Sequence, residues 1–313
     1  MASYTLLDDI DVPLIAARYG LDRLRLTPLR GGMANSSFRA EADQGDFVLT
    51  VLDNHDHGSA EHLAALTLKL FRRDVRTPAP MPTVDGGLVA DMHGRPVILK
   101  RWIEGQALDQ LPSELLPAAG MLLAEVHAVP TGDLGLPVGA RRLSDEHRAA
   151  VDSFADRDFA HWLNGRLQGV LATPTEGRRP VLVHGDFHAD NLVVHPDNQL
   201  SVLDWETATI DDPLLDIGMA LAGHARVDGA LAPGRAMQFV DGYCKVRGLT
   251  ETDLRQLPTA VEHAALILAF HRYYRHNVRF PNPAKARIHQ ELIGFVEDLH
   301  LLSFTGDDGQ RVR

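Results

Sequence analysis

The residues best suited to chemistry lie between positions 181 and 206, in the string VLVHGDFHADNLVVHPDNQLSVLDWE. Three short apolar runs, each typical of a buried strand, separate its polar residues. The first run leads into a loop with His184 and Asp186, Asn191 precedes the second run, and Asp204 ends the third. A Pro-Asp-Asn turn joins the second and third runs into a predicted hairpin.

These residue types match the needs of phosphoryl transfer. The reaction requires a carboxylate that orients and deprotonates an acceptor hydroxyl, and hard oxygen ligands that hold Mg²⁺ on the phosphates. Protein kinases use the spacing H-R-D-x-x-x-x-N followed by a later D-F-G. The spacing from His184 through Asp186 to Asn191 is the same. We therefore expect Asp186 to be the catalytic base, and Asn191 and Asp204 to bind Mg²⁺.

Two other interpretations of this segment stay open. One is an Asx-rich loop beside an ordinary hairpin, although the complete string in its strand–loop–hairpin context favours the catalytic interpretation. The other is a zinc site, because His184 and His188 are four residues apart and Asp186 and Asp190 lie beside them. The preceding strand and Gly185 do not favour the helical geometry that such a pair would need.

The strings HGDFHADN and LDWE resemble the signature of the aminoglycoside phosphotransferase and choline kinase superfamily, which are small-molecule kinases with a protein-kinase-like fold. Asp190 before Asn191 is similar to bacterial homoserine kinases of this superfamily. The Asp-Trp-Glu string at 204–206 is similar to its drug and choline kinases. The resemblance implies that His184 braces the catalytic loop and that Asp216 supports it from below. A first-turn acid favoured by the helix dipole is the alternative for Asp216.

A glycine-rich loop in the first part of the chain suits phosphate binding. Gly31 and Gly32 follow an expected strand at 24–29, and glycines let the backbone approach phosphate oxygens. The loop is similar to the Gly-Gly-x-x-Asn-x-x-Tyr/Phe loop of homoserine-kinase-like proteins. An ordinary hairpin turn is the alternative. The further candidates for nucleotide binding in this loop are Asn35, Ser36 and Ser37.

The hairpin that follows, at 36–41 and 47–52, lacks an expected lysine. In kinases its second strand carries a lysine that contacts the α- and β-phosphates, but in FVLTVLDN that place is taken by Thr50. The resembling homoserine kinases also show Thr in a similar string. Glu61, near the start of a helix over 59–73, is the candidate carboxylate that orients the phosphate site. A solvated surface glutamate is the alternative.

A hinge is predicted where a buried strand at 96–99 leads into Lys-Arg-Trp-Ile-Glu-Gly. This segment lies between a β-rich first third and a helical remainder. Backbone groups of Arg101, Trp102 and Ile103 are expected to read the adenine edge, and any strand-to-loop exit is the alternative.

Most of the remaining chain is predicted to be helical, with helices over 144–163, 250–278 and 284–302. Pro213 should start another helix, capped by Asp212. The end of the 250–278 helix is rich in cations and aromatics, which suits an acceptor with a carboxylate or an ordinary surface helix end. The candidate substrate-binding residues are Asp186, His188, Asp190, Glu206, Arg272, Tyr273 and Arg275.

Composition narrows the class of protein. The 313 residues suffice for one large domain or two lobes. A formal net charge of −11 argues against nucleic acid as the main partner. The single cysteine excludes an intramolecular disulfide, and neither a targeting segment nor a run of transmembrane length is evident. We expect a cytoplasmic protein without a membrane partner, and the sequence is compatible with a homodimer.

The predicted fold is α+β: a bilobal protein-kinase-like fold with an N-terminal antiparallel sheet lobe and a mainly helical C-terminal lobe. Residues 1–100 would bind the nucleotide, 101–106 would form the hinge, and 107–313 would form the catalytic and substrate-binding lobe. A small-molecule acceptor and ATP or GTP with Mg²⁺ are the expected ligands.

The predicted reaction moves the γ-phosphoryl group to a hydroxyl of the acceptor. The glycine loop, Thr50 and Asp190 favour homoserine or a similar amino alcohol. An aminoglycoside, macrolide or nucleoside antibiotic is the second hypothesis. A non-catalytic nucleotide-binding module is the third, motivated by Thr50, although the intact set of Asp186, Asn191 and Asp204 argues against it.

Overall fold

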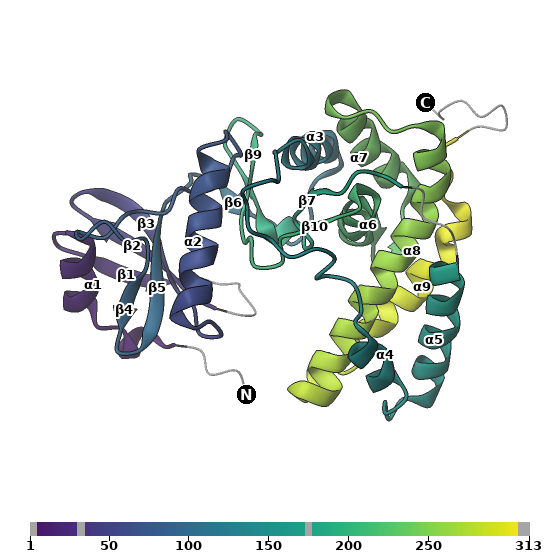
Figure 1. Ribbon diagram of the computed structural model, residues 1–313, viewed down its shortest axis with the longest axis horizontal. Coiled ribbons are helices and arrows are strands. Elements are labelled where there is room, and N and C mark those ends of the chain that lie inside the picture. The colour runs from purple at the N-terminus through teal and green to yellow at the C-terminus, as the bar shows by residue number, and fades with distance from the viewer. Residues whose placement is uncertain (1–4, 30–34, 173–176, 306–313) are drawn as a thin grey trace. The chain divides into compact units, whose positions relative to one another are not determined.

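The structure is a computed structural model that describes residues 5–29, 35–172 and 177–305 (Figure 1). The chain forms two compact units. The first comprises Met1–Ala107 and Val193–Glu206, and the second comprises Leu108–Leu192 and Thr207–Arg313. An antiparallel sheet in the N-terminal part and helices in the C-terminal part confirm the predicted α+β class. The functional assignment of 1–100, 101–106 and 107–313 stays a prediction.

A five-stranded antiparallel sheet forms the centre of the first unit. Its strand order is β1-β2-β3-β5-β4, and the predicted hairpin of β2 and β3 is confirmed. The strands are β1 (Arg25–Pro28), β2 (Ser36–Ala42), β3 (Gly45–Val51), β4 (Ala90–Met92) and β5 (Arg95–Arg101).

The two faces of this sheet have different environments because side chains alternate along each strand. On one face, Phe47, Leu49 and Val97 pack with helix α1 (Val12–Tyr19) into a hydrophobic core. On the other face, Ile98 packs against small side chains of helix α2 (His57–Phe71).

A small sheet in the same unit holds the segment that ends at Asp204. Strand β8 (Leu192–Val194) lies between β6 (Gln106–Ala107) and β9 (Leu200–Val202). The indole Nε1 of the buried Trp205 donates a hydrogen bond of 3.0 Å to Thr77 Oγ1, which anchors the chain after β9.

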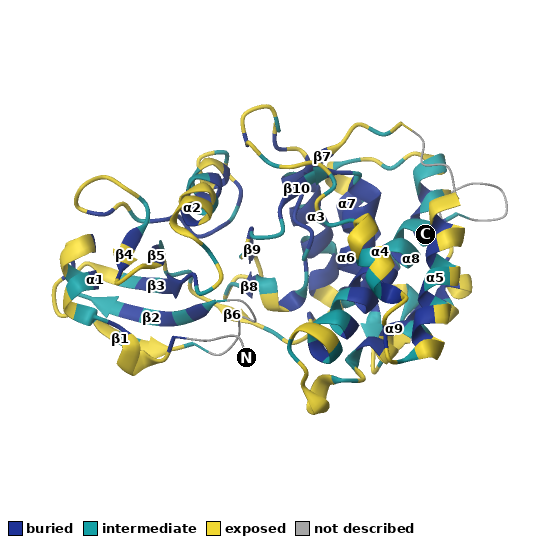
Figure 2. Cartoon of the chain, turned by 60° about the horizontal axis from the view of Figure 1, so that its bottom comes forward, coloured by how far each residue is buried: buried dark blue, intermediate teal, exposed yellow. Residues whose placement is uncertain are grey.

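Helices form most of the second unit. They are α3 (Leu116–His127), α4 (Asp145–Val151), α5 (Arg157–Ala172), α6 (Pro213–His224), α7 (Pro233–Val246), α8 (Glu251–Tyr273) and α9 (Glu291–Glu297). Helix α6 is almost entirely buried (Figure 2). The short strands β7 (Val181–Val183) and β10 (Thr209–Asp211) pair antiparallel, and β11 (Arg226–Val227) pairs with β12 (Ala230–Leu231).

Two predicted helices are interrupted. The helix expected over 144–163 is divided into α4 and α5, because the Asp156 carboxylate accepts the Phe159 N–H and caps a new helix. The helix expected over 284–302 consists of short 3₁₀ turns on both sides of α9.

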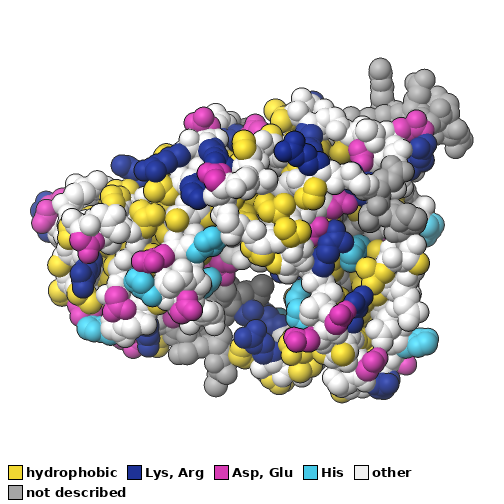
Figure 3. Space-filling model, in the orientation of Figure 1, with side chains coloured by type: hydrophobic (Ala, Val, Ile, Leu, Met, Phe, Trp, Pro, Cys, Tyr) yellow, Lys and Arg dark blue, Asp and Glu magenta, His cyan; other side chains and the backbone are white. Residues whose placement is uncertain are grey.

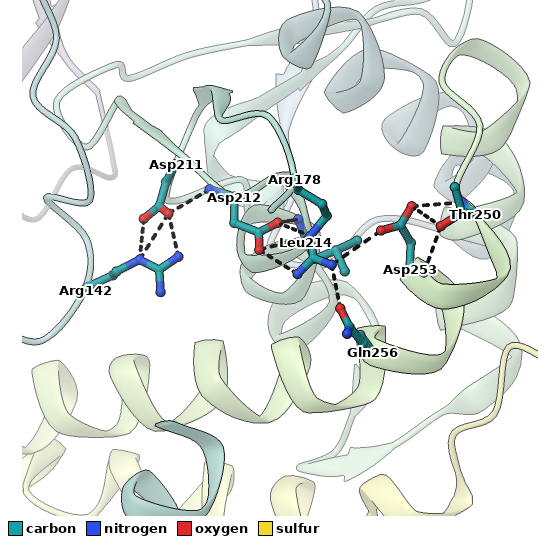
Figure 4. A network of polar contacts seen from close by, with 8 residues as sticks. All are labelled: Arg142, Arg178, Asp211, Asp212, Leu214, Thr250, Asp253 and Gln256. Carbon is teal, nitrogen blue, oxygen red and sulfur yellow. Dashed lines mark hydrogen bonds and ion pairs between the residues drawn. The ribbon is translucent and has the colours of Figure 1, made fainter. Parts of the chain in front are cut away.

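A polar network fixes the start of α6 (Figure 4). Asp212 accepts the Leu214 N–H at 2.9 Å, which confirms it as the cap of the helix that Pro213 starts. The Arg178 guanidinium donates to Asp212 at 2.8 Å and lies 3.5 Å from Asp253 in the first turn of α8. Because one arginine links the beginnings of two helices, α6 has a defined position for the residues it carries.

The surface carries both signs of charge. On the face drawn in Figure 3, acidic and basic side chains are interspersed. Among the residues that the structure describes, none of the helices combines the length and apolarity that crossing a membrane requires.

Candidate phosphotransfer site

The catalytic loop begins where the buried strand β7 ends. Gly185 has φ +78°, and a Cβ atom there would lie 2.7 Å from the carbonyl oxygen of Thr207. Only glycine fits such a turn without strain. The turn is also held by Arg141, whose Nε donates a hydrogen bond of 3.0 Å to the Gly185 carbonyl. Asp186 is thus presented at the end of a rigid strand-to-loop exit.

A buried carboxylate supports this turn. Asp216 on α6 accepts the backbone N–H groups of His184 at 2.7 Å and Gly185 at 2.8 Å. It also contacts His127 Nε2 at 3.0 Å. Burial raises the pKa of Asp216, but the His127 side chain and the Gly185 N–H outweigh it and hold this pKa below its usual value. The support that the resemblance implied for Asp216 is therefore present.

Asp186 and Asn191 are in direct contact. The side-chain amide of Asn191 donates to the Asp186 carbonyl at 2.9 Å and to its carboxylate at 3.1 Å. His184, which is fully buried, accepts the Asp186 N–H through Nδ1 at 3.3 Å. Asp190 is exposed to solvent. The loop thus holds the Asp186 carboxylate near the surface of the unit, with about a third of its side chain exposed (38%).

His188 lies on the other side of the same carboxylate. Its Nε2 is 3.4 Å from Asp186 Oδ1. Burial lowers the pKa of His188, so that its ring is neutral near pH 7. Within the described residues, His188 Nδ1 is buried and has no hydrogen-bond partner.

The predicted metal ligands offer hard oxygen donors. Because the Asn191 NH₂ group points to Asp186, its Oδ1 is directed to the opposite side. Asp204 has φ +55°, a strained conformation for a non-glycine residue that is common at functional sites. An amide and a carboxylate oxygen fit Mg²⁺ or Ca²⁺. Among the described residues, no three His, Cys, Asp or Glu side chains form a metal-binding group.

Glu206 is the centre of a second polar group, within the first unit. It accepts a hydrogen bond from the Asn35 side-chain amide. His55 Nε2 lies 3.6 Å from Glu206 Oε1, and the interaction with this carboxylate raises the pKa of His55. The predicted phosphate-binding Asn35 thus contacts Glu206, and sequence analysis did not identify His55.

Two of the predicted nucleotide-binding residues have partners within the protein. Ser36 is buried and donates to Asp53 at 2.6 Å, so it anchors the sheet. Glu61 is mostly exposed and pairs with His57 at 3.4 Å on the surface of α2, in agreement with the surface alternative. Glu61 is exposed because the alanines of α2 face the sheet and Glu61 lies on another side of the helix. Gly31 and Gly32 lie outside the described residues.

The predicted hinge is partly occupied by the protein's own hydrogen bonds. The Arg101 N–H donates to the Ala79 carbonyl at 2.9 Å, and the Trp102 N–H donates to the Asp46 carbonyl at 3.1 Å. The Ile103 N–H has no partner among the described residues. Among the described N–H groups of this segment, that of Ile103 is the one that could donate to an adenine, and the predicted role of the segment's backbone groups stays a prediction.

Lys100 is a candidate that sequence analysis did not single out. It precedes the predicted hinge on β5, and burial lowers the pKa of its ammonium group, while Asp204 and Glu206 raise it. Thr50 is buried, and its Oγ1 has no partner among the described residues. Ser37 lies opposite Thr50 on the neighbouring strand. The position of Lys100 follows from the pairing of β3 with β5, which the sequence alone does not give.

The predicted acceptor residues on and after α8 separate into different environments. Arg272 Nη1 lies 3.3 Å from Glu291 Oε2, and Arg226 Nη1 lies at the same distance from this oxygen. Burial, followed by the charge of Arg226, lowers the pKa of Arg272.

Tyr273 is buried among aromatic rings, and its hydroxyl accepts the Asp156 N–H. Tyr273 thus packs in the aromatic core of the second unit, and its role at the acceptor stays a prediction. The Arg275 guanidinium stands 5.9 Å from the ring centre of Phe280.

A cavity of about 330 Å³ lies beside these residues. A Cβ atom on Gly223 would approach His188 Nδ1 to 2.2 Å. Because His188 also contacts Asp186, the cavity adjoins the catalytic loop. It is lined by Asp109, Gln110, Gly223, Arg226, Asp228, Gly229 and Glu291.

An antiparallel sheet, a helical unit and a strand-to-loop exit with Asp186 and Asn191 define the class of kinase-like small-molecule phosphotransferases. The chain belongs to the phosphotransferase enzyme family (APH), whose family model matches residues 25–257. It is a small-molecule kinase of this family. Family membership does not favour a non-catalytic nucleotide-binding module.

The relatives to which the chain is similar include bacterial homoserine kinases. That of Beijerinckia indica subsp. indica is 27% identical over 293 residues, with 87% of each chain covered. That of Methylobacillus glycogenes is 26% identical over 255 residues, which cover 79% of this chain and 80% of the relative.

Solved structures with the same fold include kinases for several acceptors. An amicoumacin kinase in complex with AMP-PNP, Ca²⁺ and its acceptor has a TM-score of 0.69 at 14% identity and covers 93% of this chain and 94% of its own. A microcompartment-associated aminopropanol kinase has a TM-score of 0.67 at 18% identity, with 92% and 96% covered. A spectinomycin phosphotransferase with ADP and spectinomycin has a TM-score of 0.64 at 16% identity, with 91% and 92% covered.

The carboxylate of Asp186 is expected to be required for turnover. Asp186→Asn removes the proton acceptor but keeps the size of the side chain, so kcat should fall by roughly 10²–10⁴-fold. Steady-state kinetics with Mg²⁺-ATP and the acceptor would measure this. Asp158→Asn, in the exposed first turn of α5, is the matched control. Turnover at the wild-type rate in Asp186→Asn would exclude the role.

Removal of the Asp216 charge is expected to destabilise the second unit. Asp216→Asn removes the carboxylate that accepts two buried backbone N–H groups and places an NH₂ group against these donors, so the free energy of unfolding should fall by about 1–3 kcal/mol. Urea denaturation at pH 7 would measure this.

The same change has a defined pH dependence. The pKa of Asp216 is lower in the folded than in the unfolded protein, where it is about 3.9. Its stabilising contribution is therefore fully present above that value and is lost as the pH falls through the folded-state pKa. The difference in stability between wild type and Asp216→Asn should be constant near neutral pH and shrink in acid. A difference that grows in acid would contradict the charged state of Asp216.

The contact between Gly223 and His188 gives a further prediction. Gly223→Ala should displace the His188 ring and reduce kcat/KM on the order of 10²-fold, because small misplacements beside reacting groups are costly. Kinetics and thermal melting would be measured together. Gly169→Ala in α5, where an added Cβ meets nothing within 4 Å, is the control. Unchanged kinetics in both variants would show that His188 has no role near the acceptor.

Proposed function

We propose that the chain transfers the γ-phosphoryl group of ATP or GTP to the hydroxyl of a small zwitterionic amino alcohol, of which homoserine is the first candidate. The observation that carries this proposal is the convergence of Arg226 and Arg272 on Glu291 beside the Asp186 loop. Paired arginines suit a carboxylate, and the nearby acid suits an ammonium group.

Each residue of the catalytic loop has a role in this proposal. Asp186 accepts the hydroxyl proton and directs the oxygen to the phosphorus atom. The Asn191 amide fixes the Asp186 side chain, and the neutral His188 packs against it on the acceptor side. Asn191 and Asp204 would hold Mg²⁺, which neutralises charge on the phosphates when bound. Ile103 would read the adenine edge through its backbone.

The charges beside the loop support this acceptor class. Arg272 is more than two thirds buried, and its positive charge is stabilised by Glu291 and Asp186. An acceptor carboxylate would give Arg272 and Arg226 a second anionic partner. The names of the curated relatives support homoserine within this class.

An antibiotic acceptor is the second candidate, and one observation favours it. The cavity beside Gly223 is lined by three carboxylates, Asp109, Asp228 and Glu291, and by one guanidinium. An excess of negative charge suits a polycation such as an aminoglycoside. Structures of the same fold bind spectinomycin and amicoumacin.

Three matched acceptors separate these possibilities. Homoserine carries an ammonium and a carboxylate, 3-aminopropan-1-ol lacks the carboxylate, and 4-hydroxybutyrate lacks the ammonium. We expect kcat/KM to be highest for homoserine with Mg²⁺-ATP or Mg²⁺-GTP. Arg272→Met should lower kcat/KM for homoserine by about 10–100-fold, the range for a hydrogen bond to a charged group. The value for 3-aminopropan-1-ol should change little.

The matched control is Arg255→Met, an exposed arginine of α8 that pairs only locally with Glu251. An equal loss for homoserine and 3-aminopropan-1-ol would contradict carboxylate binding by Arg272. Turnover of an aminoglycoside, macrolide or nucleoside antibiotic with homoserine untouched would replace the first candidate by the second.

A further inference from the structure

The sheet of the first unit lacks the lysine that kinases place on β3, yet it carries a lysine on the strand next to it. Strand β3 has Thr50 at the expected place, and its sequence GDFVLTV contains no cation. In the antiparallel register of β3 and β5, Thr50 lies opposite Ile98 and Val48 lies opposite Lys100. Residues directly opposite each other project from the same face of a sheet. Thr50 and Lys100 therefore share one face.

This face is the one that does not contribute to the core with α1. Phe47, Leu49 and Leu99, which alternate with Val48, Thr50 and Lys100, fill that core. Helix α2 covers the shared face at Ile98, whereas Lys100 is two residues farther along the strand and only half-buried. The unpartnered hydroxyl of Thr50 lies on the same face.

Acidic side chains of the same unit act on the charge of Lys100. The carboxylates of Asp204 and Glu206 both act on its ammonium group. Among the described residues, Lys100 makes no ion pair within 4.0 Å, so its donors are available to a ligand. Glu206 is held by Asn35 and His55, which fixes a carboxylate that acts electrostatically on Lys100.

The other cation on this face is already engaged. Arg39 lies opposite Val48 in the same cross-strand row. Its guanidinium donates to Asp46 at 2.8 Å and stands 4.8 Å from the centre of the Trp102 ring. Of the two cations in this cross-strand row, Lys100 is therefore the better candidate to bind an anion.

We propose that Lys100 of β5 contacts the phosphate oxygens of the nucleotide in place of the absent β3 lysine, and that Glu206 orients it in place of the exposed Glu61. Lysine is a compact point charge on a flexible stem, so it can reach the same phosphates from an adjacent strand. This inference rests on the proposed use of ATP or GTP, but not on the identity of the acceptor.

Nucleotide binding without any acceptor tests the proposal. Isothermal titration of the full chain would give Kd for Mg²⁺-ATP and for adenosine. Lys100→Met should raise Kd for Mg²⁺-ATP by about 10–100-fold, the range for losing a hydrogen bond to a charged group. Kd for adenosine should stay the same, because adenosine has no phosphate. Lys69→Met, an exposed lysine on α2, is the matched control.

A second variant tests the relocation itself. Thr50→Lys in the Lys100→Met protein returns a lysine to the β3 position on the same face. It should recover at least part of the lost affinity for Mg²⁺-ATP, whereas a purely structural role of Lys100 would not be repaired there. Thermal melting of each variant would confirm that it is folded.

The outcomes are distinguishable. Wild-type affinity for Mg²⁺-ATP in Lys100→Met would overturn this inference alone. Equal losses of affinity for Mg²⁺-ATP and adenosine would also overturn it, since they would indicate a structural defect. Absence of Mg²⁺-ATP and Mg²⁺-GTP binding by the wild-type protein would overturn the proposed function and this inference with it.

Discussion

One buried carboxylate holds the catalytic loop in place. The two oxygens of Asp216 accept the backbone N–H groups of His184 and Gly185, and His127 Nε2 lies 3.0 Å from the same carboxylate. A carboxylate that accepts several N–H groups strongly prefers its ionised form. The conformation of Gly185 determines the direction in which the chain continues from β7 to Asp186. The network around Arg178 supports Asp216 indirectly, because it fixes the start of α6, the helix that carries Asp216.

The sequence predicted well those features that depend on near neighbours. The Asp186 and Asn191 contact follows from four intervening residues in one loop, and the Asp212 cap follows from a proline start. The β2–β3 hairpin follows from alternation around a tight turn. In each case the partners are close in the chain, so that residue types and spacing largely determine the geometry.

Features that depend on distant pairings could not be predicted in this way. Lys100 becomes a candidate only through the register of β5 against β3, which are separated by α2. The exposure of Glu61 depends on which side of α2 meets the sheet. Tyr273 has the composition of a ligand-binding residue, but packing against α5 takes it into the core. Local sequence contains no information about which of these surfaces will be covered.

The pairing of β3 with β5 has an evolutionary consequence. Two positions on one face of a sheet can each carry a lysine at the same time, so a protein lineage can gain the second cation before it loses the first. Function need not be interrupted along such a path. A comparison that scores only the β3 column of an alignment would then register a lost residue, although the sheet has kept its charge. In such lineages the positive charge is conserved on one face of the sheet, although the residue that carries it changes its position in the sequence.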